Sequence, residues 1–186
     1  MTASILLICR ANLCRSPSAE VMLSRALYAA GVDADVSSAG LEVLPGQAAP
    51  HDFVELAYIR GIDLRAHEQV KFTEVLAEPA DLVLPMTRSL LRTMVLSAPT
   101  LWPRSFTLLE IVRRGTSIEP PEEGDTLATW IGRVHRSRDR AELTSLDPVD
   151  DVLDPMEGAT DSNEEMFAVI ERAARRLAHL VAAVSG

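Results

Sequence analysis

The sequence predicts an α/β protein built on an open, twisted, four-stranded parallel sheet with helices on both faces. Apolar runs of strand length alternate with amphipathic segments of helical length, as parallel βαβ units with right-handed crossovers require. The first run, residues 4–8, is apolar in the way that is typical of a buried central strand. The length of 186 residues suits one domain with a sizeable core.

The remaining elements follow in chain order. After the first strand, the pattern predicts helices at 17–30 and 50–60, strands at 35–39 and 81–85, and a short helix at 72–78 between them. A helix at 89–96, a short strand at 104–107 and a helix at 108–113 come next. The last helix, 163–184, carries an apolar stripe that would pack on the sheet, made of Met166, Ile170, Ala173, Ala174, Leu177, Leu180 and Val181.

Residues 115–150 show the weakest pattern and predict an insertion of loop and helix into the single domain of residues 1–186. The stretch 126–134 suggests a helix, and 116–124 a loop. We interpret the insertion as a solvated, partly mobile connection, with a lid or a partner-binding element as the alternative.

A tight loop from Cys9 to Ser16 joins the first predicted strand to the first predicted helix. Pro17 fits the first turn of that helix, because the N–H that proline lacks has no intrahelical partner there. Apolar residues then follow at helical spacing up to Gly31, a residue typical of a helix end. Such a loop gathers backbone N–H groups in front of the positive end of a helix dipole, so it predicts a phosphate-binding site.

The side chains of this loop would make a bound phosphate react. Cys9 lies beside an arginine in the nest, a setting that favours the nucleophilic thiolate. Arg15 offers a planar fork of donors that matches two phosphoryl oxygens. Ser16 can donate a hydrogen bond to the Cys9 sulfur, and Asn12 suits a left-handed bend. Cys9 and Arg15 are therefore the candidate catalytic residues, and the candidate phosphate-binding residues are Arg10, Ala11, Asn12, Leu13, Cys14 and Ser16.

The string Cys9, Asn12, Cys14, Arg15, Ser16, Pro17 resembles the signature of the low-molecular-weight protein tyrosine phosphatase family. The stretches 36–40, 61–63 and 80–86, together with His67, also resemble that family. The resemblance implies a sheet of strand order 2-1-3-4 with the phosphate-binding loop after the first strand. It further implies that Ser16, Ser38 and His67 hold Asn12, so Ser38 and His67 are expected to support the loop.

A phosphate ester also needs an acid to protonate its leaving oxygen and a base to activate water. The resemblance implies an Asp-Pro pair shortly before the last helix, and the chain offers Asp147-Pro148 and Asp154-Pro155. Asp154 matches better, because 154–158 leads almost directly into the terminal helix and Pro155 favours extended backbone. Asp147 and Asp151 stay as alternatives.

These residues predict a phosphomonoester hydrolase, and the resemblance favours a protein tyrosine phosphatase. In this hypothesis Cys9 forms a thiophosphate, Arg15 binds phosphate and Asp154 is general acid and base. An arsenate reductase of the same fold is one alternative; it would use an external small thiol, since no cysteine follows Cys14. A catalytically silent phosphate-binding module is the other.

Two positions depart from the family pattern and bear on the substrate. Ala11 stands where the family usually has glycine, and Met156 follows the Asp-Pro pair where an aromatic residue is usual. Met156 and Leu41 would then line an apolar slot. A small phosphomonoester therefore stays open as substrate beside a phosphorylated protein.

Composition limits the partners and the setting. The net charge of −9 argues against nucleic acid or an anionic membrane as a partner. No apolar stretch approaches the roughly 20 residues that span a membrane, and the N-terminal run lacks the basic start of a signal peptide. Catalysis by a reduced thiol fits a cytoplasmic location. The four histidines are scattered singly, so neither metal nor cofactor is expected. We expect a monomer or weak dimer.

Overall fold

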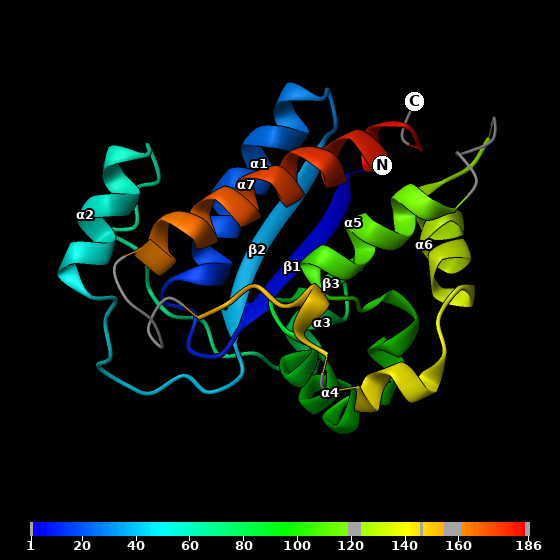
Figure 1. Ribbon diagram of the computed structural model, residues 1–186, viewed down its shortest axis with the longest axis horizontal. Helices are drawn as coiled ribbons and strands as arrows, with labels where there is room; N and C mark the ends of the chain where they lie inside the picture. Colours follow the sequence, from blue (N-terminus) through cyan, green and yellow to red (C-terminus); the bar gives the residue numbers. More distant parts are fainter. Residues whose placement is uncertain (1, 119–123, 146, 155–160, 185–186) are drawn as a thin grey trace.

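The computed structural model describes residues 2–118, 124–145, 147–154 and 161–184 (Figure 1). Its strands are β1 (Ala3–Cys9), β2 (Ala34–Gly40) and β3 (Leu82–Pro85). Its α-helices are α1 (Arg15–Ala29), α2 (His51–Ile59), α3 (Glu74–Ala77), α4 (Arg88–Ser97), α5 (Leu108–Ser117), α6 (Leu127–Arg136) and α7 (Asp161–Ala182). Three 3-10 helices complete the described elements, η1 (Pro99–Arg104), η2 (Arg140–Thr144) and η3 (Pro148–Asp150).

The strands form a parallel sheet of order β2-β1-β3. β1 is central, as its apolar sequence predicts, and each residue from Ile5 to Ile8 is at most 1% exposed. The register pairs Cys9 with Gly40, so the end of β2 lies beside the loop that follows β1. This pairing brings two distant stretches of the chain to the same edge of the sheet.

The prediction of a fourth strand at 104–107 is wrong. Within the described residues, this stretch meets the sheet at one isolated bridge, between Ser105 and Val83, and Phe106 N donates to the carbonyl oxygen of Val83 at 3.1 Å. The neighbouring elements explain the loss. η1 runs up to Arg104 and Thr107 already caps α5, so only two residues between them are available for pairing.

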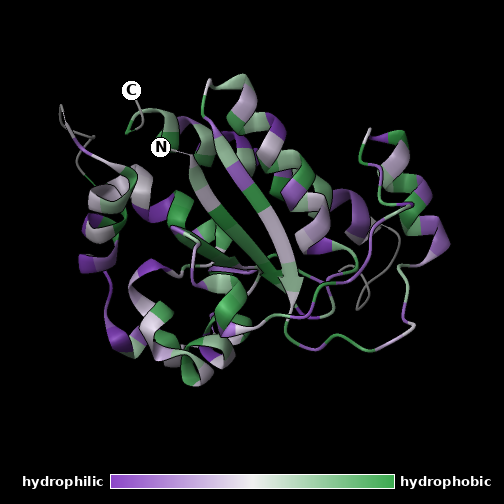
Figure 2. Cartoon of the chain, turned by 180° about the vertical axis from the view of Figure 1, so that it is seen from behind, coloured by the Kyte–Doolittle hydropathy of each residue, from purple (hydrophilic) through white to green (hydrophobic). Residues whose placement is uncertain are grey.

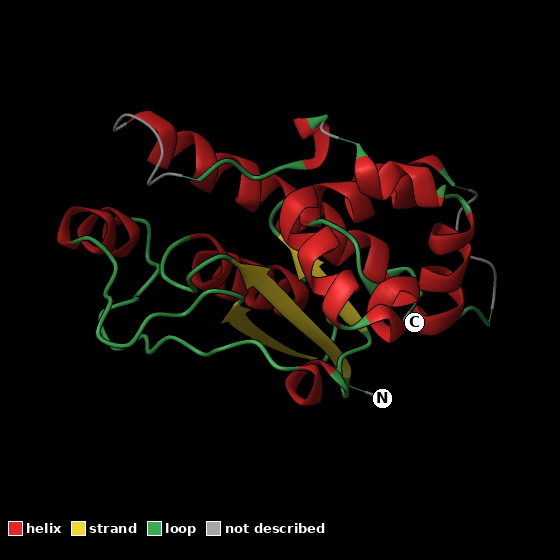
Figure 3. Cartoon of the chain, turned by 90° about the horizontal axis from the view of Figure 1, so that it is seen from below, coloured by secondary structure: helices red, strands yellow, loops and turns green. Residues whose placement is uncertain are grey.

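Two cores cover the two faces of the sheet, as the alternation of side chains along a strand requires. Ile5 and Leu7 of β1 lie in one core with residues of α1, α5, α6 and α7, whereas Leu6 and Ile8 lie in the other with residues of α3, α4 and η1. Figure 3 shows helices on both sides of the strands. The predicted arrangement of a parallel sheet between helical layers is thus confirmed.

The helices follow the predicted pattern with shifted ends. α1 begins at Arg15, two residues before the expected start, so Arg15 belongs to the first helical turn. α3 is shorter than expected, and α5 continues to Ser117. In Figure 2 the outer helices alternate hydrophilic and hydrophobic residues along their length, as amphipathic surface helices do. Among the described helices, none is both long enough and apolar enough to cross a membrane.

The described part of 115–150 packs more tightly than a solvated connection would. α6 spans Leu127–Arg136, close to the expected 126–134, and it buries Trp130, Ile131 and Val134 in the core beside α5 and α7. The stretch after α6 forms two 3-10 turns, η2 and η3. This region therefore contributes to the core.

Candidate active site

Cys9 ends β1, and the chain turns around its sulfur. The Cys9 Sγ accepts hydrogen bonds from the backbone N of Asn12 at 3.1 Å and from the Ser16 Oγ at 3.1 Å. The side chain is buried, with the residue 3% exposed. One backbone N–H and one hydroxyl are thus aimed at the sulfur of the candidate nucleophile.

Asn12 makes the bend of the loop. Its φ of 54° is left-handed, a conformation that asparagine tolerates better than most residues. Its Nδ2 donates to Ser16 Oγ at 3.0 Å and to Ser38 Oγ at 2.8 Å, and all three side chains are buried. The two serines expected near Asn12 therefore both contact its side-chain amide.

The segment 67–70 holds the outside of the same loop. The His67 Nε2 donates to the backbone oxygen of Asn12 at 2.8 Å, so the histidine contacts the main chain of Asn12 and not its side chain. The Gln69 Nε2 donates to the Ala11 oxygen at 2.5 Å, and Val70 N donates to the Asn12 Oδ1 at 2.8 Å. Gln69 was not predicted as a site residue, since a lone glutamine in a loop belongs to no motif.

Gly40 lets β2 approach the loop closely. The N–H groups after it bind the loop, Leu41 N to the Cys9 oxygen at 3.1 Å and Glu42 N to the Arg10 oxygen at 2.8 Å. A Cβ at Gly40 would lie 2.8 Å from backbone atoms of Arg10, Ala11 and Asn12. Glycine is required for this approach. The close packing of β2 on the loop is thus the physical reason for the glycine at position 40, which the resemblance to the family alone did not explain.

Arg15 projects from the first turn of α1 towards the segment 152–154. Its Nη1 donates to the Val152 oxygen at 3.2 Å, and its Nη2 forms an ion pair with the Asp154 carboxylate. The side chains of Arg15 and Asp154 are 5% and 14% exposed. The structure thus brings together two candidate residues that lie 139 positions apart in the chain.

A cavity of about 180 Å³ opens above the loop. Its walls are formed by Cys9, Arg10, Ala11, Leu13, Cys14, Arg15, Gln47 and Asp154. The predicted nucleophile, arginine and acid therefore share one concave space, together with most of the predicted phosphate-binding residues. Gln47, from the long loop after β2, is a wall residue that the sequence did not single out.

The other candidate acids occupy different positions. The Asp147 side chain is exposed and accepts from Val149 N at 3.1 Å, which caps η3. The Asp151 Oδ1 accepts from Arg88 N at 2.7 Å. Burial raises the pKa of Asp151, and the hydrogen bond from Arg88 only partly opposes this effect. Of the three aspartates, Asp154 is the one that lines the cavity.

Cys14, the second cysteine of the loop, is not suited to act as a nucleophile. Burial raises the pKa of the Cys14 thiol to about 12, and the charges of Cys9 and Asp154 add to this while Arg15 opposes it. Cys14 is therefore a protonated thiol at neutral pH. Both cysteines are free in this structure.

The departures at Ala11, Leu41 and Met156 have different outcomes. Among the described residues, Asn12 is the non-glycine residue with positive φ, so Ala11 carries a side chain without left-handed strain. Leu41 packs against the two hydrophobic cores and is not a wall of the cavity. The prediction that Leu41 lines an apolar slot is therefore wrong, and Pro155 and Met156 lie outside the described residues.

A larger cavity lies elsewhere, between α1 and α7. It measures about 760 Å³ and is lined by residues such as Arg25, Arg60, Phe167 and Arg175. It contains none of the candidate catalytic residues, so the larger cavity is not the candidate active site. In the part of the chain that the structure describes, histidine, cysteine and carboxylate side chains form no group of three suited to a metal ion.

Comparison with known proteins gives a family match. A family model described as "Low molecular weight phosphotyrosine protein phosphatase" matches residues 4–125. Among solved structures, the mutant of YwlE from Bacillus subtilis superimposes with a TM-score of 0.71 and 27% identity, covering 96% of this chain and 97% of that one.

Two curated relatives each match a little less than half of the chain. The probable low molecular weight protein-tyrosine-phosphatase EpsP of Ralstonia solanacearum is 41% identical over 86 residues, 46% of this chain and 57% of the relative. The protein-arginine-phosphatase of Bacillus subtilis is 42% identical over 84 residues, 45% of this chain and 55% of the relative. The chain thus spans little more than half the length of these curated relatives.

Proposed function

Because the chain belongs to the low molecular weight phosphotyrosine protein phosphatase family, we propose that it hydrolyses phosphomonoesters, with phosphotyrosine in proteins as the substrate class. One observation carries the proposal. The sulfur of Cys9, held by two hydrogen bonds, shares a small cavity with the guanidinium of Arg15 and the carboxyl of Asp154. Nucleophile, anion holder and proton donor are the three parts that this reaction needs.

The first step transfers the phosphoryl group to the enzyme. The Cys9 thiolate attacks phosphorus in line, and the bond from phosphorus to the ester oxygen breaks. Arg15 and the loop amides hold the equatorial oxygens, whose charge grows in the transition state. The Asp154 carboxyl gives its proton to the departing oxygen, so that an alcohol or phenol leaves.

The second step releases phosphate. A water molecule attacks the phosphorus of the thiophosphate while the Asp154 carboxylate accepts its proton, and the sulfur–phosphorus bond breaks. The hydrogen bonds from Asn12 N and Ser16 Oγ stabilise the departing thiolate of Cys9. Asp154 thus ends the cycle protonated, and Cys9 ends it ionised.

Arg15 has competing partners in this scheme. Its guanidinium pairs with Asp154 and with the Val152 oxygen. A phosphoryl group in the loop would take over part of the Arg15 fork, since bidentate contact with a dianion is stronger than contact with one carboxylate. The carboxyl of Asp154, which lines the same cavity as the Cys9 sulfur, would then face the leaving group.

Several observations support the substrate class and the setting. One matched relative is named as a tyrosine phosphatase and another as an arginine phosphatase, and both substrates are phosphoproteins. The cavity is walled by Leu13 and opens beside Gln47 and Arg10, which leaves room for a side chain presented by a protein. The two free thiols fit a cytoplasmic protein. We also infer that the protein acts as a monomer or weak dimer.

Hydrolysis of p-nitrophenyl phosphate tests the mechanism. We expect turnover by the wild type, no measurable turnover by Cys9→Ser, and a loss of about 10²- to 10⁴-fold in kcat for Asp154→Asn. Asp147→Asn is the matched comparison, because it changes the other Asp-Pro pair. Wild-type turnover that survives the Cys9 substitution would overturn the mechanism, and a larger loss from Asp147→Asn would transfer the acid role to Asp147.

Competing substrates test the class. A phosphotyrosine peptide should be hydrolysed faster than a phosphoarginine peptide or a small alkyl phosphate. A wild type that is inactive on all of these but reduces arsenate with a small thiol would replace the proposal with the arsenate reductase alternative. Binding of phosphate without turnover would leave the silent phosphate-binding module.

A further inference from the structure

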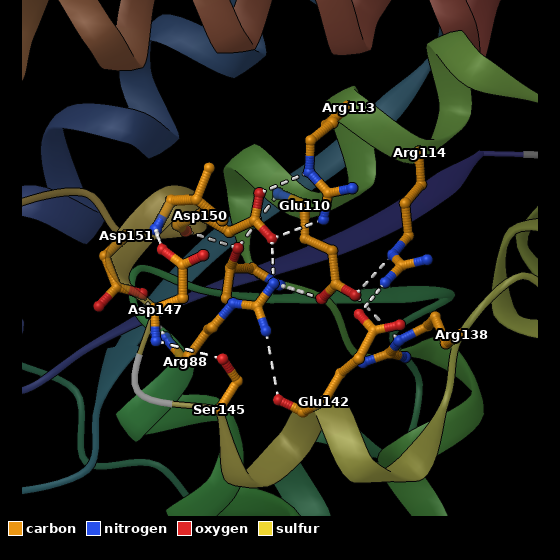
Figure 4. A network of polar contacts seen from close by, with 12 residues as sticks. Arg88, Glu110, Arg113, Arg114, Arg138, Glu142, Ser145, Asp147, Asp150 and Asp151 are labelled. Carbon is orange, nitrogen blue, oxygen red and sulfur yellow. Dashed lines mark hydrogen bonds and ion pairs between the residues drawn. The ribbon is translucent and has the colours of Figure 1, made fainter.

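An ion network joins α4, α5 and η2 to Asp150, which precedes Asp154 by four residues (Figure 4). Its members come from α4, α5 and the stretch between α6 and Asp151, and they are Arg88, Glu110, Arg113, Arg114, Arg138, Glu142 and Asp150. None of these described side chains lines the cavity around Cys9. The proposed mechanism therefore leaves this network without a role.

Asp150 is the buried carboxylate at one end of the network. It is 1% exposed and accepts hydrogen bonds from Arg88 Nη2 at 2.6 Å and from Arg113 Nε and Nη2 at 2.9 and 2.7 Å. Its backbone oxygen also accepts from the Thr107 Oγ1 at 2.7 Å. Contacts to two guanidinium groups from two helices fix both the side chain and the backbone of Asp150.

The backbone runs from this anchor to the cavity in four residues. The Asp151 Oδ1 accepts from Arg88 N at 2.7 Å, and Val152 N donates to the Met86 oxygen at 2.8 Å. The Val152 oxygen in turn accepts from Arg15 Nη1 at 3.2 Å. Each of residues 150–152 is therefore held in sequence, so a displacement of Asp150 is passed on to the residues that place Asp154.

The remainder of the network ties η2 to the same place. The Arg88 Nη1 donates to the Glu142 oxygen at 3.2 Å, so one guanidinium contacts both Asp150 and η2. Arg114 bonds Glu110 at 2.9 Å and pairs with Glu142, and the Arg138 Nε lies 3.1 Å from the Glu110 Oε1. The region after α6 is thereby locked against α4 and α5.

We propose that Asp150 is a positioning residue that sets the place of the general acid through residues 151–153. The inference rests on the proposed function, in which Asp154 protonates the leaving group. Proton transfer is efficient only at hydrogen-bond distance from the leaving oxygen, so a small shift of the segment lowers the rate. The backbone of the phosphate-binding loop is held by other contacts, from 38–42 and 67–70, and none of these contacts involves Asp150.

Asp150 carries its charge at neutral pH. Burial raises the pKa of this carboxyl, but hydrogen bonds from Arg113 and Arg88 outweigh burial and hold the pKa below its ordinary value. The change Asp150→Asn keeps the shape of the side chain and removes the charge that the two guanidinium groups face. It therefore weakens the anchor without creating a cavity.

The test compares leaving groups. Phenol leaves less readily than p-nitrophenol, so phenyl phosphate depends more on the acid. We expect Asp150→Asn to lower kcat/KM for phenyl phosphate about 10-fold more than it lowers kcat/KM for p-nitrophenyl phosphate. Asp154→Asn should show a larger difference between the two substrates in the same direction. Inhibition by inorganic phosphate should change less than threefold, because the loop is intact. Asp139→Asn is the matched control, since Asp139 is exposed and only caps η2.

A second pair of variants covers the case in which Asp150→Asn does not fold. Arg113 is 44% exposed, so Arg113→Gln removes one partner of Asp150 at lower risk. Arg113→Gln should shift the ratio of the two kcat/KM values in the same direction as Asp150→Asn. Arg113→Lys should bring that ratio part of the way back to the wild-type value. A wild-type ratio in Asp150→Asn, or in Arg113→Gln where Asp150→Asn does not fold, overturns the inference and leaves the proposed function standing. A wild type without phosphatase activity overturns both.

Discussion

Asn12 shows how much one residue of the loop has to satisfy. Its backbone adopts φ 54°, its amide binds two serine hydroxyls, and its side-chain oxygen accepts from Val70 N. Both asparagine and glycine tolerate this φ, but glycine offers no side chain to Ser16 and Ser38. The residue therefore combines a backbone requirement with a buried hydrogen-bond requirement.

Two substitutions at Asn12 separate the two requirements. Asn12→Gly keeps the left-handed bend and leaves buried polar groups unpaired, at a cost of about 1 to 3 kcal/mol for each group left unsatisfied. Asn12→Ala loses the same hydrogen bonds and also strains the bend, so it should unfold with about 1 kcal/mol less free energy than Asn12→Gly. Urea denaturation measures the difference. Equal stability of the two variants would show that the φ of Asn12 is not a constraint.

Gly40 gives a second prediction at the scale of a residue. The Cβ of Gly40→Ala would lie 2.8 Å from three backbone atoms of the loop, which cannot move aside as a flexible side chain can. The loop should shift, and inorganic phosphate should inhibit at least about 10-fold more weakly, because a misplaced nest loses aligned N–H donors. Competitive inhibition kinetics measure this change. An unaltered inhibition constant would contradict the close approach seen here.

At the scale of elements, the packing of α5 against α6 depends on one small residue. A Cβ at Gly115 in α5 would lie 2.6 Å from the Trp130 ring and 3.2 Å from the Leu180 Cδ1. Gly115 thus opens the space that the fully buried Trp130 of α6 fills. Glycine lowers the intrinsic stability of a helix, so its presence here is explained by packing.

A pair of glycine substitutions tests this explanation. Gly115→Ala should destabilise the protein by about 1 to 3 kcal/mol through overpacking, although alanine is the better helix former. Gly132→Ala in α6 is the control, because the nearest atom to its Cβ is the flexible Arg136 Nη1 at 3.7 Å. It should stabilise by up to about 1 kcal/mol. Thermal unfolding of both variants decides, and stabilisation by Gly115→Ala would contradict the packing argument.

At the scale of the whole molecule, the ion network makes stability depend on acidity. Hydrogen bonds from arginines overcome burial and lower the pKa of Asp150 and of Glu142. Groups with a lowered folded pKa stabilise the protein above their unfolded pKa, and this contribution is lost as the pH falls through the folded value. Asp151, whose pKa burial raises, acts in the opposite direction.

The dependence of the unfolding free energy on pH in the acid range should therefore change when Asp150 is replaced. Below the ordinary aspartate value of 3.8, the wild type should lose unfolding free energy steeply as the pH falls, and Asp150→Asn should lose less over the same range. Urea unfolding between pH 5 and pH 2.5 gives the two slopes. An unchanged slope in Asp150→Asn would contradict the lowered pKa of Asp150.

The sequence alone determined the parts that depend on short-range geometry. The strand, loop and helix from Ala3 to Ala29, with Cys9 facing the donors of Asn12 and Ser16, follow from apolar runs and from a loop of eight residues. In such a loop the chain itself brings the groups together. The alternation of helix and strand likewise predicted a parallel sheet between helical layers.

Only the tertiary structure decided what depends on distant contacts. The stretch 104–107 has the pattern of a strand, but η1 and α5 leave two of its residues free to pair. The contacts of Gln69 and the anchoring of Asp150 join residues 37 to 62 positions apart, through hydrogen bonds that carry no periodic signal. Such contacts stabilise a site because burial strengthens them, and burial is a property of the folded chain.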